Sequence, residues 1–286
     1  MPTPGPEDWL NGPGKKNGDR KGQKFSEWAH DTNSRIGPGG AVTAALKKSR
    51  KIMLVPLGDC SGVDTDALLN VLRAFYYGLE VELAPVEMTV NAKQRKSRGY
   101  GTQLLCRDVH KQLQLVKARH KAFVAVGFTM YDLYPKPGWN FVFGSAWTSQ
   151  GTGIFSFSRY KYIEDDDDNI IAERTPIDFT RRCLQVLCHE VGHLFHFKHC
   201  VYWECLMNGS NGDWESDLRP IGLCPMDLAK LQACLGFDLA EREAALAAAF
   251  AEVGIPHFAS FHARQGELLT AEPGAGCACC GPEVAA

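Results

Sequence analysis

The sequence predicts an α+β fold in which helices pack on a mixed, twisted β-sheet. Its 286 residues are enough for one large domain with a substantial core. Apolar runs typical of strands alternate with segments of helical periodicity in the first part of the chain, and helical patterns follow towards its end. Hydrophobic residues make up 45% of the chain and charged residues 22%, as in ordinary globular proteins.

The individual elements are predicted by the spacing of apolar side chains. Five short apolar or alternating runs are typical of strands: 52–57, 79–85, 123–126, 140–144 and 153–157. Five segments have the spacing typical of helices: 65–75, 102–120, 178–195, a short stretch after Pro225, and 239–253. Asp64 or Thr65 can cap the first helix, and Asp178 or Thr180 can cap the third.

Both ends of the chain lack the composition of a folded core. Residues 1–45 are rich in Gly, Pro, Asn, Lys and Asp, so we expect a disordered arm that contains a short helix near 25–30. Residues 265–286 are expected to form a flexible tail that contains cysteines. The predicted folded domain therefore covers residues 46–264.

Charge and hydrophobicity restrict the partners. The formal net charge of -2 does not favour nucleic acid or an anionic membrane as a partner. The opening MPTPGPEDWLNGPGKKNG has no apolar core of a signal peptide, and no apolar stretch approaches the ~20 residues of a membrane span. We therefore expect an intracellular protein, cytoplasmic or nuclear. In such a reducing compartment the 11 cysteines are interpreted as thiols or metal ligands rather than disulfides.

The segment CHEVGHLFHFKHC, residues 188–200, indicates a metal site. His189 and His193 are four residues apart, so a helix places them on one face, where both imidazoles can reach one zinc ion at about 2.0–2.1 Å. Glu190 is rotated away from the metal and can contact a water molecule on it. The pattern predicts metal-assisted hydrolysis.

A catalytic zinc needs a third protein ligand and one open position. His196 shares the helix face of His189 but lies about 10.5 Å further along the axis. His199 fits better if the helix ends near residue 196 and the chain turns back. We therefore expect His199 to be the third ligand.

A second group of soft ligands follows directly. Cys200, Cys205 and Cys224 are close enough in sequence to suggest a structural zinc with tetrahedral ligation. Buried structural thiols are the alternative interpretation. The spacing of these cysteines does not identify the fourth ligand.

At this point the sequence resembles the archaemetzincins, a family of zinc metallopeptidases in the metzincin clan. The family pattern HExxHxxGxxHCx4CxM, followed by CxxC, is matched by HEVGHLFHFKHCVYWECLM and the CPMD that begins at Cys224. More diffuse likeness runs through VPLGD, YDLYP, WNFVFG and GIFSFSRY, so the resemblance spans most of residues 52–235.

The resemblance implies roles for individual residues. It implies one catalytic zinc held by His189, His193 and His199, with Glu190 as the general base. It also implies a second, structural zinc held by Cys200, Cys205 and Cys224. Met207 would be the Met-turn residue, an apolar floor under the catalytic metal.

Two positions depart from the family pattern. Asp227 stands where the family has its last Cys, and a carboxylate can ligate zinc. Water in the fourth position, or a more distant Cys234, are the alternatives. His196 stands where the family has Gly, whose left-handed backbone lets the third histidine swing to the metal. We expect either a strained backbone at His196, at a cost of about 1–3 kcal/mol, or a slightly shifted helix end.

The implied fold is metzincin-like, with an upper subdomain to about residue 199 and a lower helical subdomain over 200–264. The active-site helix forms the cleft floor. The implied function is zinc-dependent hydrolysis of peptide bonds, including aminopeptidase-like cleavage of short peptides, with the substrate lying along an edge strand near 151–157. The partner is a peptide or protein substrate, and the oligomeric state is left open. The alternative is a catalytically impaired zinc protein of the same fold that binds peptides; a thiol-based metal buffer that uses the cysteines of the tail is a third interpretation.

Overall fold

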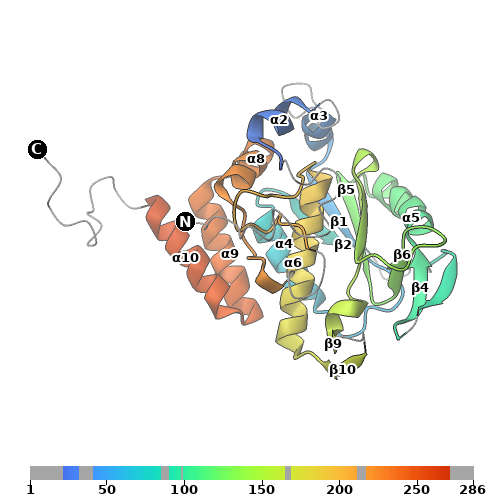
Figure 1. The fold of residues 1–286 in the computed structure, drawn as a ribbon. Helices are drawn as coiled ribbons and strands as arrows, with labels where there is room; N and C mark the ends of the chain where they lie inside the picture. Colours follow the sequence, from blue (N-terminus) through green and yellow to red (C-terminus); the bar gives the residue numbers. More distant parts are fainter. Residues whose placement is uncertain are drawn as a thin grey trace, which may run out of the picture.

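A mixed five-stranded sheet lies at the centre of the fold in the computed structural model (Figure 1). Its strands follow the order β2, β1, β5, β8 and β7. They are β1 (Lys51–Pro56), β2 (Glu80–Leu83), β5 (Val124–Thr129), β7 (Gly144–Trp147) and β8 (Thr152–Ser156). The first four in that order run parallel, and β7 pairs with β8 in the antiparallel direction as the outer strand. The predicted mixed sheet is therefore confirmed.

The structure describes residues 22–31, 41–84, 90–97, 99–164, 169–210 and 217–270. Two smaller sheets lie within these ranges. In one, β3 (Gln94–Ser97) pairs antiparallel with β4 (Gly101–Leu105), which runs parallel to β6 (Asp132–Tyr134). In the other, β9 (Tyr162–Glu164) pairs antiparallel with β10 (Ile170–Glu173). The acidic residues between β9 and β10 lie outside the described ranges.

Helices cover both faces of the central sheet (Figure 1). They are α2 (Phe25–His30), α3 (Ala41–Lys48), α4 (Thr65–Phe75), α5 (Cys106–Arg119), α6 (Pro176–Leu194), α8 (Pro225–Leu235), α9 (Leu239–Val253) and α10 (Pro256–Thr270). Met53 and Val55 of β1 face the smaller core, to which α5 contributes. Ile52 and Leu54 face the larger core, to which α4, α6, α8 and α9 contribute. Alternate side chains of a strand point to opposite faces, so β1 joins the two cores.

The helix that carries the predicted site begins with a defined cap. The side chain of Thr175 accepts a hydrogen bond from the amide of Asp178, and Pro176 occupies the first turn, where a missing N–H costs nothing. The prediction that Asp178 or Thr180 caps this helix is therefore wrong.

Two predicted elements differ from the structure, and one long helix was not predicted. The strand expected at 140–144 lies at Gly144–Trp147, where pairing with β8 sets its position. The helix expected over 102–120 begins only at Cys106, because the preceding residues pair with β3 and β6 as β4. Helix α10 has no predicted counterpart. His262 is its buried residue, and Phe258 and Ala259 pack against the larger core while partly exposed.

The expectation of disordered ends needs correction where the structure describes them. The short helix expected near 25–30 is present as α2, but Trp28 on it is fully buried in the core. Burial of such a large apolar side chain anchors this part of the arm. At the other end, α10 continues to Thr270, beyond the expected domain end at 264. Residues 1–21, 32–40 and 271–286 lie outside the described ranges.

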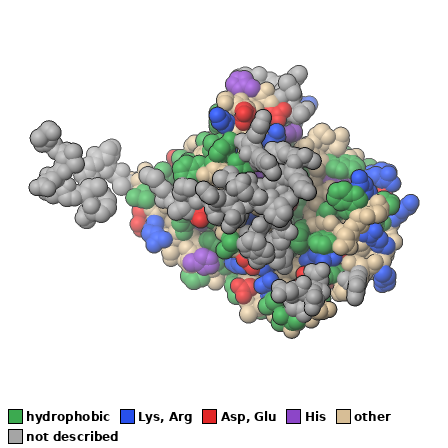
Figure 2. Space-filling model, viewed as in Figure 1, with side chains coloured by type: hydrophobic (Ala, Val, Ile, Leu, Met, Phe, Trp, Pro, Cys, Tyr) green, Lys and Arg blue, Asp and Glu red, His purple; other side chains and the backbone are tan. Residues whose placement is uncertain are grey.

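The surface carries one visible concentration of charge. Lys and Arg side chains gather at the side formed by β4 and α5 (Figure 2). Among the described residues, no helix combines the length and the apolar character that crossing a membrane requires.

Candidate metal centre

Helix α6 carries His189, Glu190 and His193 close to its C-terminal end. The ring centroids of His189 and His193 lie 4.7 Å apart, and their Nε2 atoms are 3.1 Å apart. His189 is buried, whereas Glu190 and His193 line a cavity. The spacing of four residues thus places the two rings side by side, because they lie one turn apart on the same face.

The chain turns back sharply after α6 in a Schellman motif. The amide of Phe197 donates to the carbonyl of Gly192 at 3.2 Å, and the amide of His196 donates to the carbonyl of His193 at 2.8 Å. His196 has a φ of 62°, in the left-handed region that favours glycine. Of the two outcomes expected for His196, the structure has the strained backbone.

This turn brings His199 back to the helical pair. Its ring centroid lies 5.4 Å from that of His189 and 5.1 Å from that of His193. One ring nitrogen from each of the three residues lies within 4.8 Å of the others. His196 is not part of this group, although it lines the same cavity. The structure therefore brings His199, and not His196, next to the pair.

Backbone carbonyls hold two of the rings in one orientation. Nδ1 of His189 is 2.7 Å from the carbonyl oxygen of Leu206, and Nδ1 of His193 is 2.6 Å from that of Phe197. A carbonyl oxygen only accepts, so each Nδ1 donates its proton and each Nε2 presents a lone pair. Two lone pairs 3.1 Å apart repel each other unless a cation lies between them. These residues therefore fit a bound zinc ion.

A buried arginine lies beside this group. Nη1 of Arg219 donates to the carbonyl of Asn208 at 3.2 Å. It also lies 3.1 Å from Nδ1 of His189, a contact that is not a hydrogen bond in the tautomer whose Nδ1 donates to Leu206. Burial lowers the pKa of His189, and the charge of Arg219 lowers it further, which favours the neutral ring that binds metal. Burial raises the pKa of Glu190 to about 7, against the opposite effects of His199 and Arg219.

Two glycines allow close packing around the three histidines. A Cβ on Gly192 would lie 2.7 Å from Sδ of Met207, which is fully buried. A Cβ on Gly209 would lie 2.9 Å from Nδ1 of His199. The absence of side chains therefore lets Met207 pack against α6 and lets the following loop pack against His199.

The three histidines lie beside a cavity of about 560 Å³. Gly144, Ser145 and Ala146 of β7 form one wall, and Glu190 and His193 of α6 line another part. The edge strand expected near 151–157 is wrong, because β8 lies inside the sheet and β7 is the outer strand.

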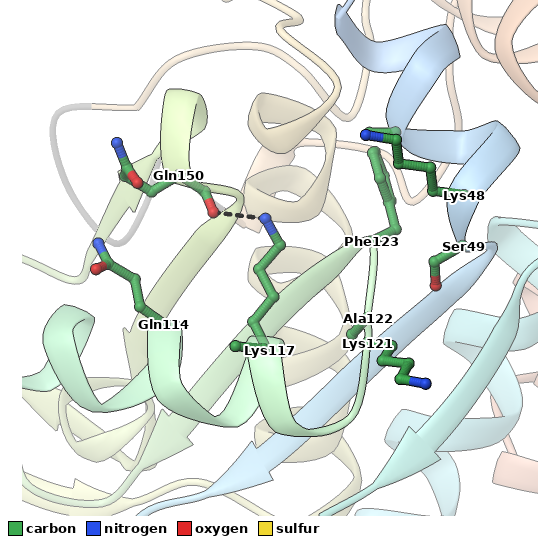
Figure 3. A pocket seen from close by; sticks show the side chains of 10 residues that line it. Lys48, Ser49, Gln114, Lys117, Lys121, Ala122, Phe123 and Gln150 are labelled. Carbon is green, nitrogen blue, oxygen red and sulfur yellow. Dashed lines mark hydrogen bonds between the residues drawn. The ribbon is translucent and has the colours of Figure 1, made fainter.

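A second cavity of similar volume lies away from the histidines, between α3 and α5 (Figure 3). Lys48, Lys117 and Lys121 line it, and Lys117 donates to the carbonyl of Gln150 at 2.7 Å. The amine of Lys121 points away from that of Lys117 (Figure 3), so the three amines do not converge on one ligand position. This cavity contains none of the predicted site residues.

Three cysteines and one aspartate form a second group of potential metal ligands. Their ligand atoms lie within 4.8 Å of one another, and all four residues are buried: Cys200, Cys205, Cys224 and Asp227. The amides of Met207 and Cys224 donate to Sγ of Cys205 at 3.4 and 3.3 Å. Hydrogen bonds from the thiols of Cys205 and Cys224 lower the pKa of Cys200. Sulfur ligands with amide donors around them fit a structural zinc.

The carboxylate of Asp227 divides its two oxygens between this group and a lysine. Oδ2 is 3.3 Å from Sγ of Cys205 and 3.6 Å from Sγ of Cys224. Oδ1 accepts from Nζ of the buried Lys230 at 2.7 Å. Burial raises the pKa of Asp227, and the charge of Lys230 acts against this rise. Cys234 is outside the group and lines a separate cavity beside α3.

The described cysteines are free thiols, in agreement with their interpretation as thiols or ligands. Residues 74–233, more than half of the chain, match the family model described as Peptidase family M54. The chain belongs to this family.

Archaemetzincins are among the proteins with which this M54 chain aligns. The chain is 39% identical to archaemetzincin-2 of Homo sapiens over 203 residues, which cover 63% of the chain and 56% of that protein. It is 29% identical to archaemetzincin of Pyrococcus furiosus over 190 residues, which cover 65% of the chain and 94% of that protein. The chain thus spans little more than half the length of its human relative.

A solved structure shares the fold. The crystal structure of archaemetzincin from Methanopyrus kandleri superimposes with a TM-score of 0.50 at 26% identity, covering 66% of this chain and 97% of that one. The resemblance found in the sequence is therefore confirmed at the level of family and of a mixed α/β fold.

Two residues that organise this M54 site were not among the sequence candidates. The side chain of Asn208 accepts from the amide of Cys205 and donates to the carbonyls of Cys200 and Trp203, so it holds the loop between the two ligand groups. Arg219 contacts His189 from the buried side. The Asn-Gly pair at 208 is a turn signal that could have indicated the first; nothing in the sequence indicates the second.

Proposed function

We propose that this chain is a zinc-dependent peptidase in which His189, His193 and His199 hold the metal and Glu190 is the general base. One observation carries the proposal: three imidazoles converge beside a carboxylate in a cavity whose wall is an outer strand. Membership of Peptidase family M54 supports it.

The residues around the cavity have separate roles in this reaction. When bound, zinc would polarise the scissile carbonyl and acidify a water molecule. Glu190 takes a proton from the attacking water and returns it to the leaving amine. Its burial favours this role, because a raised pKa allows the carboxyl group to exchange a proton near neutral pH.

The outer strand offers a place for an extended substrate. β7 pairs with β8 along one edge, and its residues Gly144 to Ala146 line the cavity together with Glu190 and His193. A peptide added to the other edge of β7 would lie across the cavity, held by main-chain hydrogen bonds. We propose short peptides as substrates, with aminopeptidase-like cleavage as the form to test first.

Two further assignments complete the metzincin-like site. Met207 is proposed to act as the Met-turn floor, because it is fully buried and packs against Gly192 between the helical histidines. A second zinc is proposed for Cys200, Cys205, Cys224 and Asp227. The carboxylate oxygen nearest to the sulfurs supplies the fourth ligand.

The Glu190→Gln variant tests the enzymatic role directly. We expect it to keep its zinc content and to lose about 100-fold or more of its peptide cleavage, as expected for removal of a general base. Glu252→Gln, an exposed residue of α9, is the matched control and should cleave like the wild type. A zinc-loaded wild type that binds peptides but cleaves none would support the peptide-binding alternative.

Elemental analysis tests the metal assignments. Two zinc ions per chain are expected for the wild type and one for His199→Ala, because the second group lacks His199. An unchanged zinc content of His199→Ala would disprove this ligand choice. Comparing peptides with free and acetylated N-termini decides whether cleavage depends on the amino end.

A further inference from the structure

Residues 22–31, which we call the clasp, lie against the turn that leads to His199. The clasp contains α2, and in Figure 1 α2 sits beside α8 at the end of α6 that carries the histidines. Trp28 of the clasp is fully buried, and its ring meets that of Phe197 edge-on at 5.8 Å between centroids. The clasp is therefore packed on the turn that leads to His199, although more than 160 residues separate the two in sequence.

Side chains of the clasp bind the peptide groups of the turn. Nε2 of Gln23 donates to the carbonyl of His196 at 3.2 Å, and Oε1 of Gln23 accepts from the amide of Lys198 at 3.2 Å. Nε1 of Trp28 donates to the carbonyl of Phe195 at 3.1 Å. Since the His193 ring binds the carbonyl of Phe197, the carbonyls from residue 195 to 197 all have partners.

The turn needs external support because of the residue at its left-handed position. His196 adopts a φ of 62°, which glycine adopts without strain and histidine does not. A strained residue persists only where its surroundings over-determine its conformation. The two hydrogen bonds of Gln23 join the residues on either side of Phe197, the carbonyl of His196 and the amide of Lys198. They therefore oppose rotation of the His196 backbone out of this conformation.

We propose that Gln23 is a positioning residue that holds the left-handed turn at His196 and thereby delivers His199 to the metal. This inference rests on the proposed function, in which His199 is a zinc ligand. Gln23 itself is buried and is not part of the histidine group. Its hydrogen bonds to His196 and Lys198, which line the cavity, go to main-chain atoms. It acts through the backbone of residues 196–198.

The same residue links the turn to the second ligand group. Nζ of Lys230 donates to the carbonyl of Gln23 at 2.8 Å and to Oδ1 of Asp227 at 2.7 Å. All three residues are buried, so one ammonium group joins the clasp to the carboxylate beside the cysteines. The clasp is thus in contact both with the backbone of the turn before His199 and with the lysine that pairs with Asp227.

A double-mutant cycle on metal affinity tests the proposal. In the full chain, Gln23→Ala should weaken binding of Co²⁺ at the histidine group by about tenfold, since buried peptide groups lose their partners. In the His196→Gly background the same change should weaken Co²⁺ binding by less than about threefold, because glycine adopts the left-handed conformation without strain. The readouts are the d–d absorption of Co²⁺ and its dissociation constant. Gln94→Ala, on the exposed side of β3, is the control and should bind Co²⁺ like the wild type.

Two further measurements separate positioning from a general effect on the fold. Hydrogen exchange in Gln23→Ala should rise at residues 195–200 and stay unchanged in α4 and α9. Gln23→Glu keeps the acceptor for Lys198 and for the buried ammonium of Lys230 but loses the donor to His196, so it should give an intermediate affinity. Equal losses in the wild-type and His196→Gly backgrounds, or no loss in either, would overturn the proposal. Failure of the proposed function would instead show as a zinc-loaded wild type that cleaves no peptide, or as Glu190→Gln retaining cleavage. The metal and exchange readouts measure neither.

Discussion

A buried histidine behind the outer strand makes the stability of this protein depend on pH. His110 on α5 is fully buried, and its ring stacks on Trp147 at 4.3 Å between centroids. Its nitrogens lie 3.0 Å from the hydroxyls of Thr152 and Ser145, so the ring joins β8 to the β7 wall of the cavity. Burial lowers the pKa of His110 from 6.5 to about 4. The native state therefore holds this ring neutral at pH values where the unfolded chain protonates it.

The sign and the size of the effect follow from proton linkage. Below pH 6.5 His110 becomes protonated in the unfolded state, whereas in the native state it stays neutral down to about pH 4. The free energy of unfolding therefore falls as the pH drops through this window. At pH 5 the loss from this residue is about 2 kcal/mol, and it approaches about 3 kcal/mol near pH 4. Above about pH 7.5 His110 contributes no pH dependence.

Urea unfolding of the wild type and of His110→Gln at about pH 7.5 and pH 5 measures this contribution. Glutamine can still bond to the hydroxyls but does not titrate, so the wild type should lose about 2 kcal/mol more than the variant on going to pH 5. The other titrating groups, including the histidines of the metal centre, are common to both proteins and cancel in the difference. Equal losses in the two proteins would refute the assignment of a buried, neutral His110.

Three substitutions test the packing around the site and in the C-terminal helices. Gly192→Ala should destabilise the protein by about 1–2 kcal/mol, because its Cβ would lie 2.7 Å from Sδ of Met207; a raised melting temperature would contradict this. Trp28→Ala should cost about 3–5 kcal/mol in urea unfolding, as for a fully buried aromatic side chain, whereas an arm that contributes nothing to the core would give no change. Glu243→Ala should cost about 3–5 kcal/mol, because it leaves the buried Arg242, 2.7 Å away, without its counter-charge; a loss below about 1 kcal/mol would be inconsistent with that ion pair.

Local patterns predicted much of the fold. The apolar run that became β1 and the apolar stripes of α4, α6 and α9 lie within a few residues of their expected positions. These elements bury a continuous face, so their periodicity is imposed by the core. β4 was predicted as part of a helix and β7 was misplaced, because the boundaries of a strand depend on which strands pair with it.

In the candidate site, too, local spacing predicted some features and distant contacts decided others. The spacing of His189 and His193 alone predicted that their rings lie together, because a helix fixes the geometry of residues four apart. The position of His199 required the turn at His196, and this turn is held by Gln23 and Trp28 from the other end of the chain.

By itself the sequence determined the candidate ligands, the helix that carries two of them, and the family to which the chain belongs. Only the tertiary structure decided which strand forms the cavity wall, where Asp227 directs its two oxygens, and that the N-terminal segment packs on the turn before His199. The physical reason is distance along the chain. Contacts within one helix or strand follow from local periodicity, whereas contacts between residues far apart in sequence depend on how separate elements pack.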